Sequence, residues 1–216
     1  MKISSAILFL LLSFLSTQLS SQISLGAKLS HVKAHQEYGD VILPDNAEIH
    51  VNGVQGALMV YYPLSKHLSL GLEPGLVQRG AACEPGFDNF VADTKLLLTY
   101  AELPLMLSAR LPFLRNRLAL LGKLGYGAGF LLQATREVTQ PGLGSQPLVT
   151  RLDLENSNEL TRWDHGAHLG LGLAFQFGKN QLLLESSYYA GIPDADPENT
   201  SKNRGLQMGL GYLITL

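Results

Sequence analysis

Six charged residues occupy the same phase of a strictly alternating pattern, so opposite charges among them could meet in one narrow interior. They are Glu73, Arg79, Glu102, Arg110, Lys123 and Glu185. Buried charges need partners of opposite sign, and this set holds three carboxylates and three cations. We therefore predict a paired charge network with a structural role, and a transport or gating role is the alternative.

Two further sets contain the residue types of hydrolytic sites. Asp164 and His165 form an Asp-His pair, but neighbours on a strand point to opposite faces of the sheet. Ser187, His168 and Glu185 share the inward phase of adjoining predicted strands, as a hydrolase triad would require. No supporting signature accompanies them, so we interpret all of these side chains as interior packing and expect no catalytic residues.

Metal and cofactor sites are not predicted either. His31, His35 and His50 flank one predicted loop, and their spacing does not match a standard zinc site. The single cysteine, Cys83, excludes an internal disulfide and is interpreted as a free thiol in a loop. We therefore expect no bound metal and no cofactor.

The element that must position these residues is a strand repeated about eight times between residues 22 and 216. In each repeat an apolar side chain stands at every second position, and long polar loops alternate with short turns. Only a closed barrel can present such apolar faces to lipid while pairing every backbone group. The sequence therefore predicts an all-β fold, an eight-stranded antiparallel up-and-down transmembrane β-barrel.

The alternation also fixes where the strands and loops should lie. The predicted strands are 23–30, 51–62, 68–79, 97–110, 118–133, 163–177, 181–191 and 206–216. Long loops are predicted at 34–50, 81–95, 134–161 and 192–203. Pro104 falls inside a strand, where it has no N–H to donate, so we expect a bulge or bend there. Eight strands enclose an interior that side chains can fill, which argues against open conduction.

Aromatic residues near the strand ends predict the girdles that mark a membrane interface. They are Tyr61, Tyr62, Tyr126, Trp163, Tyr188 and Tyr212.

Residues 1–21 have the features of a cleavable secretory signal peptide. Lys2 gives a positive start, 7–15 is an apolar run and 16–21 is a polar exit. The run is shorter than the ~20 residues that a membrane-spanning helix needs. Residues 22–216 then form one barrel domain, and the formal net charge of −2 argues against nucleic acid as a partner.

Several stretches resemble the outer-membrane β-barrel proteins of Bacteroidetes-type bacteria, including the PorT-like proteins. These stretches are 56–81, 96–112, 120–132, 163–177, 182–192 and the C-terminal GLQMGLGYLITL. A Gln-Lys-Gly-like triplet of that family corresponds to Gln-Arg-Gly at 78–80. Its Tyr-x-Glu-x-Pro motif corresponds to Tyr100, Glu102 and Pro104, whereas Leu216 departs from the usual terminal aromatic.

The resemblance implies a location in the bacterial outer membrane, with outer-membrane lipid around the barrel. PorT is implicated in protein secretion across that membrane, so envelope or secretion-complex proteins are the implied partners. We expect a non-enzymatic barrel with an interaction or envelope-structure role through its extracellular loops, or a secretion-machinery accessory. The alternatives are a barrel enzyme acting on lipid or peptide and a small-solute channel.

Overall fold

The computed structural model describes residues 22–38, 50–83, 93–115, 117–139, 147–154, 160–196 and 200–216. The predicted signal peptide lies outside these ranges. The strands are β1 (Ser24–Tyr38), β2 (Val51–Pro63), β3 (Leu68–Leu72), β4 (Gly75–Cys83), β5 (Asp93–Phe113), β6 (Leu118–Thr139), β7 (Leu148–Arg151), β8 (Trp163–Phe177), β9 (Asn180–Asp196) and β10 (Ser201–Thr215). Within the described ranges, no helix is long and apolar enough to cross a membrane.

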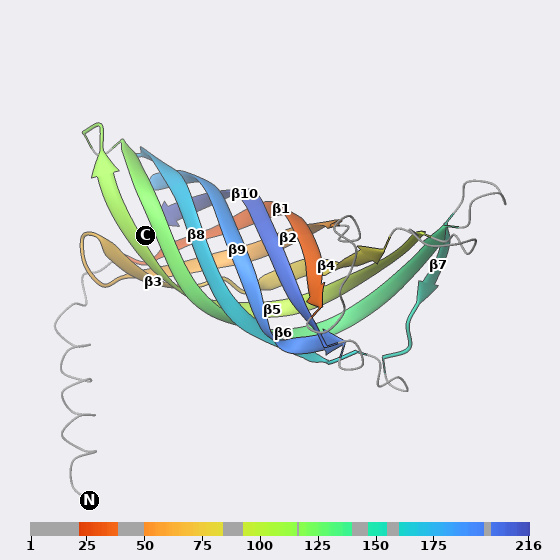
Figure 1. Cartoon of the computed structure of the whole chain (residues 1–216). Coiled ribbons are helices and arrows are strands. Elements are labelled where there is room, and N and C mark those ends of the chain that lie inside the picture. The colour runs from red at the N-terminus through yellow and green to blue at the C-terminus, as the bar shows by residue number, and fades with distance from the viewer. Residues whose placement is uncertain are drawn as a thin grey trace, which may run out of the picture.

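The strands follow one another around a single closed sheet (Figure 1). β3 and β4 together form one interrupted barrel strand, and β7 pairs with the far end of β6. The ring closes where β1 pairs with β10, from Ser24 opposite Thr215 to Tyr38 opposite Ser201. The predicted eight-stranded antiparallel up-and-down barrel is therefore confirmed.

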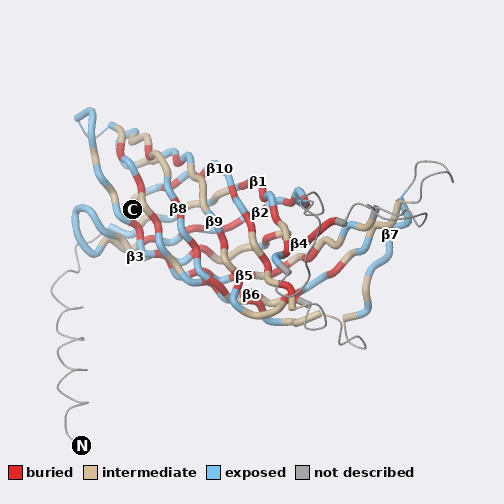
Figure 2. The backbone as a smooth tube through the Cα atoms, in the orientation of Figure 1, coloured by how far each residue is buried: buried red, intermediate tan, exposed pale blue. Residues whose placement is uncertain are grey.

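Burial alternates residue by residue along the strands (Figure 2). In β2 every second residue from Val51 to Tyr61 is buried, and the residues between them are exposed. The exposed positions carry large apolar side chains, and Leu29, Leu58 and Leu169 are each more than 60% exposed. An apolar outer face is stable in lipid, because the closed sheet pairs its backbone groups internally.

Several strands run further toward the long connections than the apolar alternation predicts. β1 continues to Tyr38, β6 to Thr139 and β9 to Asp196, so the predicted loops 34–50, 134–161 and 192–203 are partly wrong. Beyond the lipid both faces of a strand can be polar, so backbone pairing continues without a hydrophobic pattern to reveal it.

One short strand and the end of another were also missed in the predicted loops. β7 lies inside the predicted loop 134–161 and pairs with residues 135–138 of β6. Cys83 is the last residue of β4 and pairs with Thr94, so it does not lie in a loop as predicted. The ends of β5 and β6, together with β7, project beyond the other strands (Figure 1).

The irregularity expected at Pro104 is found in the neighbouring strand instead. β5 runs without a break through Pro104, and the register shift between β5 and β6 lies at Thr99 and Tyr100. Facing Pro104, the chain is interrupted at Glu73 and Pro74, between β3 and β4. The Glu73 amide donates to the Pro104 carbonyl at 3.1 Å. The partner strand thus adapts to the missing N–H, and Glu73 is left with its side chain buried.

Short turns gather at one end of the barrel, which we call the turn end; we call the opposite end the loop end. The turns lie at 64–67, between β2 and β3, at 114–117, between β5 and β6, and at Gly178 and Lys179. Gly178 has a φ of 61°, a left-handed conformation that glycine adopts without strain. In transmembrane barrels short turns face the periplasm, so we expect the loop end to face the cell exterior.

The interior is filled in layers. Buried apolar side chains near the turn end are Met59, Tyr61, Ala119, Leu121, Ala174, Leu183 and Leu213. A second apolar cluster near the loop end consists of Val32, Ala34, Val77, Leu98, Tyr100, Leu131 and Ala134. Leu152, Leu154 and Leu160, from the connection between β7 and β8, pack against that second cluster. Charged side chains occupy the middle of the barrel.

Candidate functional site

The first group of interior charges, which we call the arginine layer, consists of Tyr100, Glu102, Asp164, His168, Tyr189 and Asn203 around Arg79. The Arg79 side chain is fully buried, and its Nη2 donates to Glu102 Oε1 at 2.6 Å. Its Nη1 lies 3.5 Å from Asp164 Oδ2. The guanidinium carbon stands 3.6 Å from the centroid of the Tyr189 ring. One cation thus serves two carboxylates and stacks on an aromatic ring.

Neutral side chains complete the arginine layer. Asn203 Nδ2 donates to Asp164 Oδ2 at 3.0 Å and to the Tyr100 hydroxyl at 3.1 Å. His168 Nε2 lies 3.3 Å from Glu102 Oε1, and its ring centroid lies 4.9 Å from that of Tyr189. Each carboxylate therefore contacts a second polar side chain in addition to Arg79.

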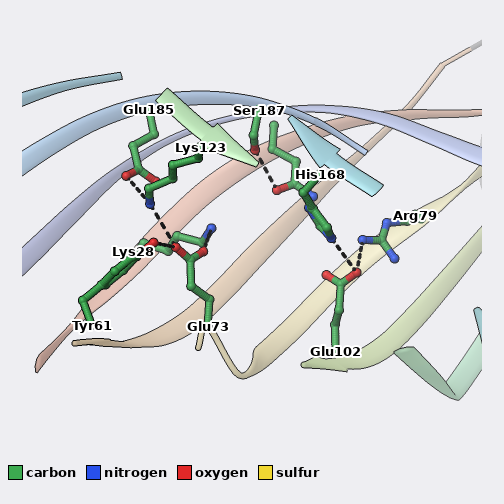
Figure 3. A network of polar contacts seen from close by, with 10 residues as sticks. Lys28, Tyr61, Glu73, Arg79, Glu102, Lys123, His168, Glu185 and Ser187 are labelled. Carbon is green, nitrogen blue, oxygen red and sulfur yellow. Dashed lines mark hydrogen bonds and ion pairs between the residues drawn. The ribbon is translucent and has the colours of Figure 1, made fainter. Parts of the chain in front are cut away.

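The second group, which we call the lysine layer, consists of Lys28, Tyr61, Glu73, Lys123 and Glu185 (Figure 3). Lys123 Nζ lies 2.9 Å from Glu73 Oε1 and 2.5 Å from Glu185 Oε1. Lys28 forms an ion pair with the other oxygen of Glu73, and the Tyr61 hydroxyl donates to Glu73. Two cations here balance two carboxylates.

Small residues on the inward face make room for these large side chains. A β-carbon built at Gly127, on β6, would lie 2.8 Å from His168 Nε2 and 3.2 Å from Glu102 Oε1. Both distances are shorter than ordinary van der Waals contact, so a larger residue would displace the charged groups. Gly127 therefore makes room for the contact of His168 with Glu102.

Five of the six residues of the predicted network lie in these two layers, and Arg110 does not. Arg110 lies near the turn end, where its Nη2 donates to Gln176 Oε1 at 2.9 Å. Arg79 and Glu102 contact each other in the arginine layer, whereas Lys123 contacts both Glu73 and Glu185 in the lysine layer. The structure thus divides the six predicted residues among three places.

Seven members of the two layers were absent from the predicted network, among them Lys28, Asp164 and Tyr61. Lys28 shares the inward phase of its strand with Ser24 and Gly26, and that phase could have identified it. Asp164 is inward as well, and it was considered only beside His165. Tyr61 was predicted to lie in the interface girdle, which is wrong: its side chain is buried and bonded to Glu73.

Four of the other residues of the predicted girdle lie on the outer face. Tyr126, Trp163, Tyr188 and Tyr212 are each more than 40% exposed, whereas Tyr62 is half-buried. Trp163 also packs edge-on against Phe130 of the neighbouring strand, with the ring centroids 5.0 Å apart.

The side chains considered as a hydrolase triad have separate partners. Ser187 Oγ donates to Gln207 Oε1 at 3.3 Å, His168 contacts Glu102, and Glu185 contacts Lys123 (Figure 3). A serine nucleophile needs a hydrogen bond to its base, and these contacts do not supply one. Asp164 and His165 lie on opposite faces, as predicted: Asp164 is buried, and His165 Nδ1 lies 2.5 Å from the Tyr126 hydroxyl outside.

The histidines at the loop end lie close together without a wider ligand set. The rings of His35 and His50 meet edge to face, with their centroids 5.1 Å apart, and His31 is exposed on the outer face of β1. In the part of the chain that the structure describes, no group of three or more His, Cys, Asp or Glu side chains is arranged to hold a metal ion.

The two motifs behind the family resemblance meet in the arginine layer. Arg79 of the Gln-Arg-Gly triplet and Glu102 of the Tyr-x-Glu-x-Pro motif form its shortest ion pair, across β4 and β5. Gly80 has a φ of 148°, and a β-carbon there would lie 1.8 Å from the Leu96 carbonyl oxygen. Glycine is therefore required beside the arginine.

Comparisons with known proteins agree with this architecture. A family model described as the outer membrane protein beta-barrel domain matches residues 15–196. Neisserial surface protein A is similar in structure, with a TM-score of 0.50, 13% identity, and coverage of 90% of this chain and 97% of that one. No curated protein matches the chain in sequence.

Other solved outer-membrane proteins give lower structural scores. OprG of Pseudomonas aeruginosa has a TM-score of 0.46 and 12% identity, and covers 91% of this chain and 97% of its own. The attachment invasion locus protein Ail of Yersinia pestis has a TM-score of 0.43 and 16% identity, and covers 89% of this chain and 99% of its own.

Proposed function

The chain belongs to the outer membrane protein beta-barrel domain family and lies in the bacterial outer membrane; from this premise we propose that it is a non-enzymatic interaction protein. Its loop end meets a partner at the cell surface, and its barrel anchors that surface in lipid. The observation that carries the proposal is the filled interior. A barrel with a filled interior and no assembled catalytic set acts through its exposed surface.

The packing of the interior argues against the channel alternative. Two ionic layers cross the middle, and apolar clusters occupy both ends. A solute would have to separate ion pairs that are buried from water, and removing one partner of such a pair costs about 3–5 kcal/mol.

The loop end offers a shaped surface for a partner. All four residues of β7 are exposed, including Leu148 at 69% and Val149 at 57%. Beside β7 lies a groove of about 380 Å³. Its lining combines apolar and charged side chains: Leu132, Arg151, Leu152, Asp153, Leu154 and Arg162. An exposed apolar patch rimmed by charged side chains is typical of protein interaction sites, and arginine is enriched there.

The interaction role is tested by photocrosslinking in intact cells, with a photoreactive amino acid at Leu148 or Val149. The matched control is Leu58, which is 63% exposed on the lipid-facing side of β2 and lies far from both ends of the barrel. We expect a discrete adduct from the loop-end positions that the control does not give. Absence of any adduct beyond that of the control would refute the proposal.

The channel alternative is tested by recording from the purified protein in planar bilayers. A sealed interior predicts no steady conductance. Reproducible ohmic openings would show that the interior is an open pathway and would favour the solute-channel alternative.

We also propose that the chain is PorT-like and serves as an accessory to a secretion complex. The observation that favours this role is the contact of Arg79 with Glu102, which joins the two motifs shared with those proteins. The test is to identify the Leu148 adduct by mass spectrometry. Subunits of a secretion machine would support the accessory role, and adducts with unrelated surface proteins would contradict it.

A further inference from the structure

Arg110 is the member of the predicted charge network that has no carboxylate partner among the described residues. Its guanidinium donates to the neutral amide of Gln176, and its buried Nε has no hydrogen-bond partner within the described part of the chain. A half-buried guanidinium normally binds an anion, because it presents five donors in a fixed plane. Arg110 therefore has unused hydrogen-bond donors at the turn end of the barrel.

The charged side chains of the three turn segments around Arg110 all have the same sign. The sequence ranges 61–71, 107–121 and 174–184, which contain the three turns and the strand ends beside them, include no Asp or Glu. All 18 acidic residues of the chain lie elsewhere. The same ranges contain five cations: Lys66, Arg110, Arg115, Arg117 and Lys179. A cluster of like charge around a recess attracts ligands of opposite charge.

Two hollows adjoin Arg110. A cavity of about 70 Å³ lies toward the lumen, where Arg110 and Lys123 both line it. A groove of about 370 Å³ opens to the water at the turn end. The groove is lined by Lys66, His67, Arg110, Pro112 and Gln176. Arg110 thus stands between the interior of the barrel and the surrounding water.

Hydrogen bonds hold the walls of this groove in place. The Arg110 amide donates to the His67 carbonyl at 2.7 Å, and His67 Nδ1 lies 3.1 Å from the Arg110 carbonyl oxygen. Gln176 Nε2 donates to the Gly178 carbonyl at 2.6 Å, while the Gln176 amide donates to the Arg117 carbonyl at 2.8 Å. A recess fixed in this way loses little conformational entropy when it binds a ligand.

We propose that this groove is a binding site for the carboxylates of an acidic polypeptide segment that enters from the periplasmic side. Arg110 binds one carboxylate through its free donors, and Lys66 adds a second positive charge at the rim. The site lies at the opposite end of the barrel from the proposed cell-surface contact, so each proposal can be refuted without affecting the other.

The position of the groove favours a water-borne ligand over a membrane lipid. Arg110, Pro112 and Gln176 occupy the inward phase of their strands, whereas the lipid-facing phase carries exposed apolar residues such as Leu111 and Phe177. A lipid headgroup would have to leave the leaflet and enter the lumen to reach Arg110. A volume of about 370 Å³ accepts more than one acidic side chain.

Binding is tested with the full mature chain in lipid nanodiscs, which leave both ends of the barrel accessible. The probe is a fluorescein-labelled polyglutamate peptide, followed by fluorescence anisotropy, with polyglutamine of equal length as the neutral control. We expect saturable binding of polyglutamate that weakens as salt rises. Arg110→Gln should weaken it roughly tenfold or more, the effect of losing a hydrogen bond to a charged group.

Matched variants separate the site from general charge attraction. Lys33→Gln removes an exposed cation on the outer face at the loop end and should leave the affinity unchanged. Arg110→Lys keeps the charge and should retain part of the affinity. Heat-dependent mobility in electrophoresis verifies that each variant has formed its barrel.

Three outcomes would overturn the proposal. One is equal affinity of Arg110→Gln and the unchanged protein, and another is an equal loss in Lys33→Gln. The third concerns the source of the anion: inorganic phosphate that displaces the peptide at the peptide's own concentration would assign the groove to free small anions.

Discussion

The arginine layer and the lysine layer both bury charge inside one narrow barrel, but they balance that charge differently. In the arginine layer one guanidinium contacts Glu102 and Asp164, and its side chain is 0% exposed. In the lysine layer Lys28 and Lys123 share Glu73, and Lys123 also contacts Glu185. In the arginine layer a single cation balances the carboxylates, whereas in the lysine layer two cations balance them.

The lysine layer is also more accessible to water than the arginine layer. The side chains of Lys28 and Glu185 retain 10% and 12% exposure, and Lys123 lines the cavity of about 70 Å³ near the turn end. Arg79 contacts the Tyr189 ring and also the ring of Tyr100, a member of the apolar cluster of the loop end. Water can therefore compensate a broken contact more readily in the lysine layer, because solvation lowers the cost of an unpaired charge.

The largest effect is expected from Arg79→Met, which removes the single Arg or Lys of the arginine layer as the structure describes it. Glu102 and Asp164 would then remain buried side by side without their cation. We expect a loss of about 3–5 kcal/mol in the free energy of unfolding. The measurement is urea unfolding of the barrel from lipid vesicles, followed by tryptophan fluorescence.

The cause of that loss can be isolated. Adding Glu102→Gln and Asp164→Asn to Arg79→Met removes both orphaned charges and should restore part of the stability. If the triple variant is no more stable than Arg79→Met, lost packing against Tyr189 explains the effect better than unpaired charge.

Lys123→Met is expected to cost less, about 2–3 kcal/mol. Glu73 would keep Lys28 and the Tyr61 hydroxyl, and Glu185 would turn toward the adjoining cavity. The same unfolding measurement applies, with Lys95→Met as a control because Lys95 is exposed on the same sheet. A loss as large as that of Arg79→Met would remove the proposed difference between the layers.

The fold could be predicted from the sequence because lipid imposes a clear rule on the outer face. Outward positions within the membrane are predominantly apolar, so the alternation identified all eight barrel strands and the closure of β1 on β10. The rule ends where the lipid ends. The extensions of β1, β6 and β9 and the short β7 were missed because only backbone pairing defines them.

The residues of the two layers could be predicted from the same alternation, but not their grouping. Inward phase put Arg79 and Glu102, and Glu73 and Lys123, in the interior, and the structure has each pair in contact. Phase fixes the side of a strand, but it does not fix which residues of other strands lie at the same height. That height depends on strand register, which alternation alone leaves open, and Arg110 was therefore grouped with carboxylates that lie further inside.

Lys28→Met should cost about 1 kcal/mol, because Glu73 would retain Lys123 and Tyr61 as partners. This variant tests whether the two cations of the lysine layer are interchangeable. The measurement is the same unfolding titration, with a double-mutant cycle of Lys28→Met and Lys123→Met. The two losses should be more than additive, since the double variant leaves Glu73 without any cation. Simple additivity would mean that the lysines act on Glu73 independently.

The smallest effect is expected outside the lumen, at the pair of Arg204 and Glu37. Their side chains are 17% and 57% exposed and 2.7 Å apart, on β10 and β1 near the loop end. Arg204→Gln should cost at most about 1 kcal/mol, and added salt should reduce the difference from the unchanged protein. Ion pairs of similar length are thus expected to contribute very different free energies of unfolding inside and outside the lumen. A loss equal to that of Lys123→Met would mean that ion-pair distance, rather than burial, determines the cost, and the contrast between the two layers would then need another cause.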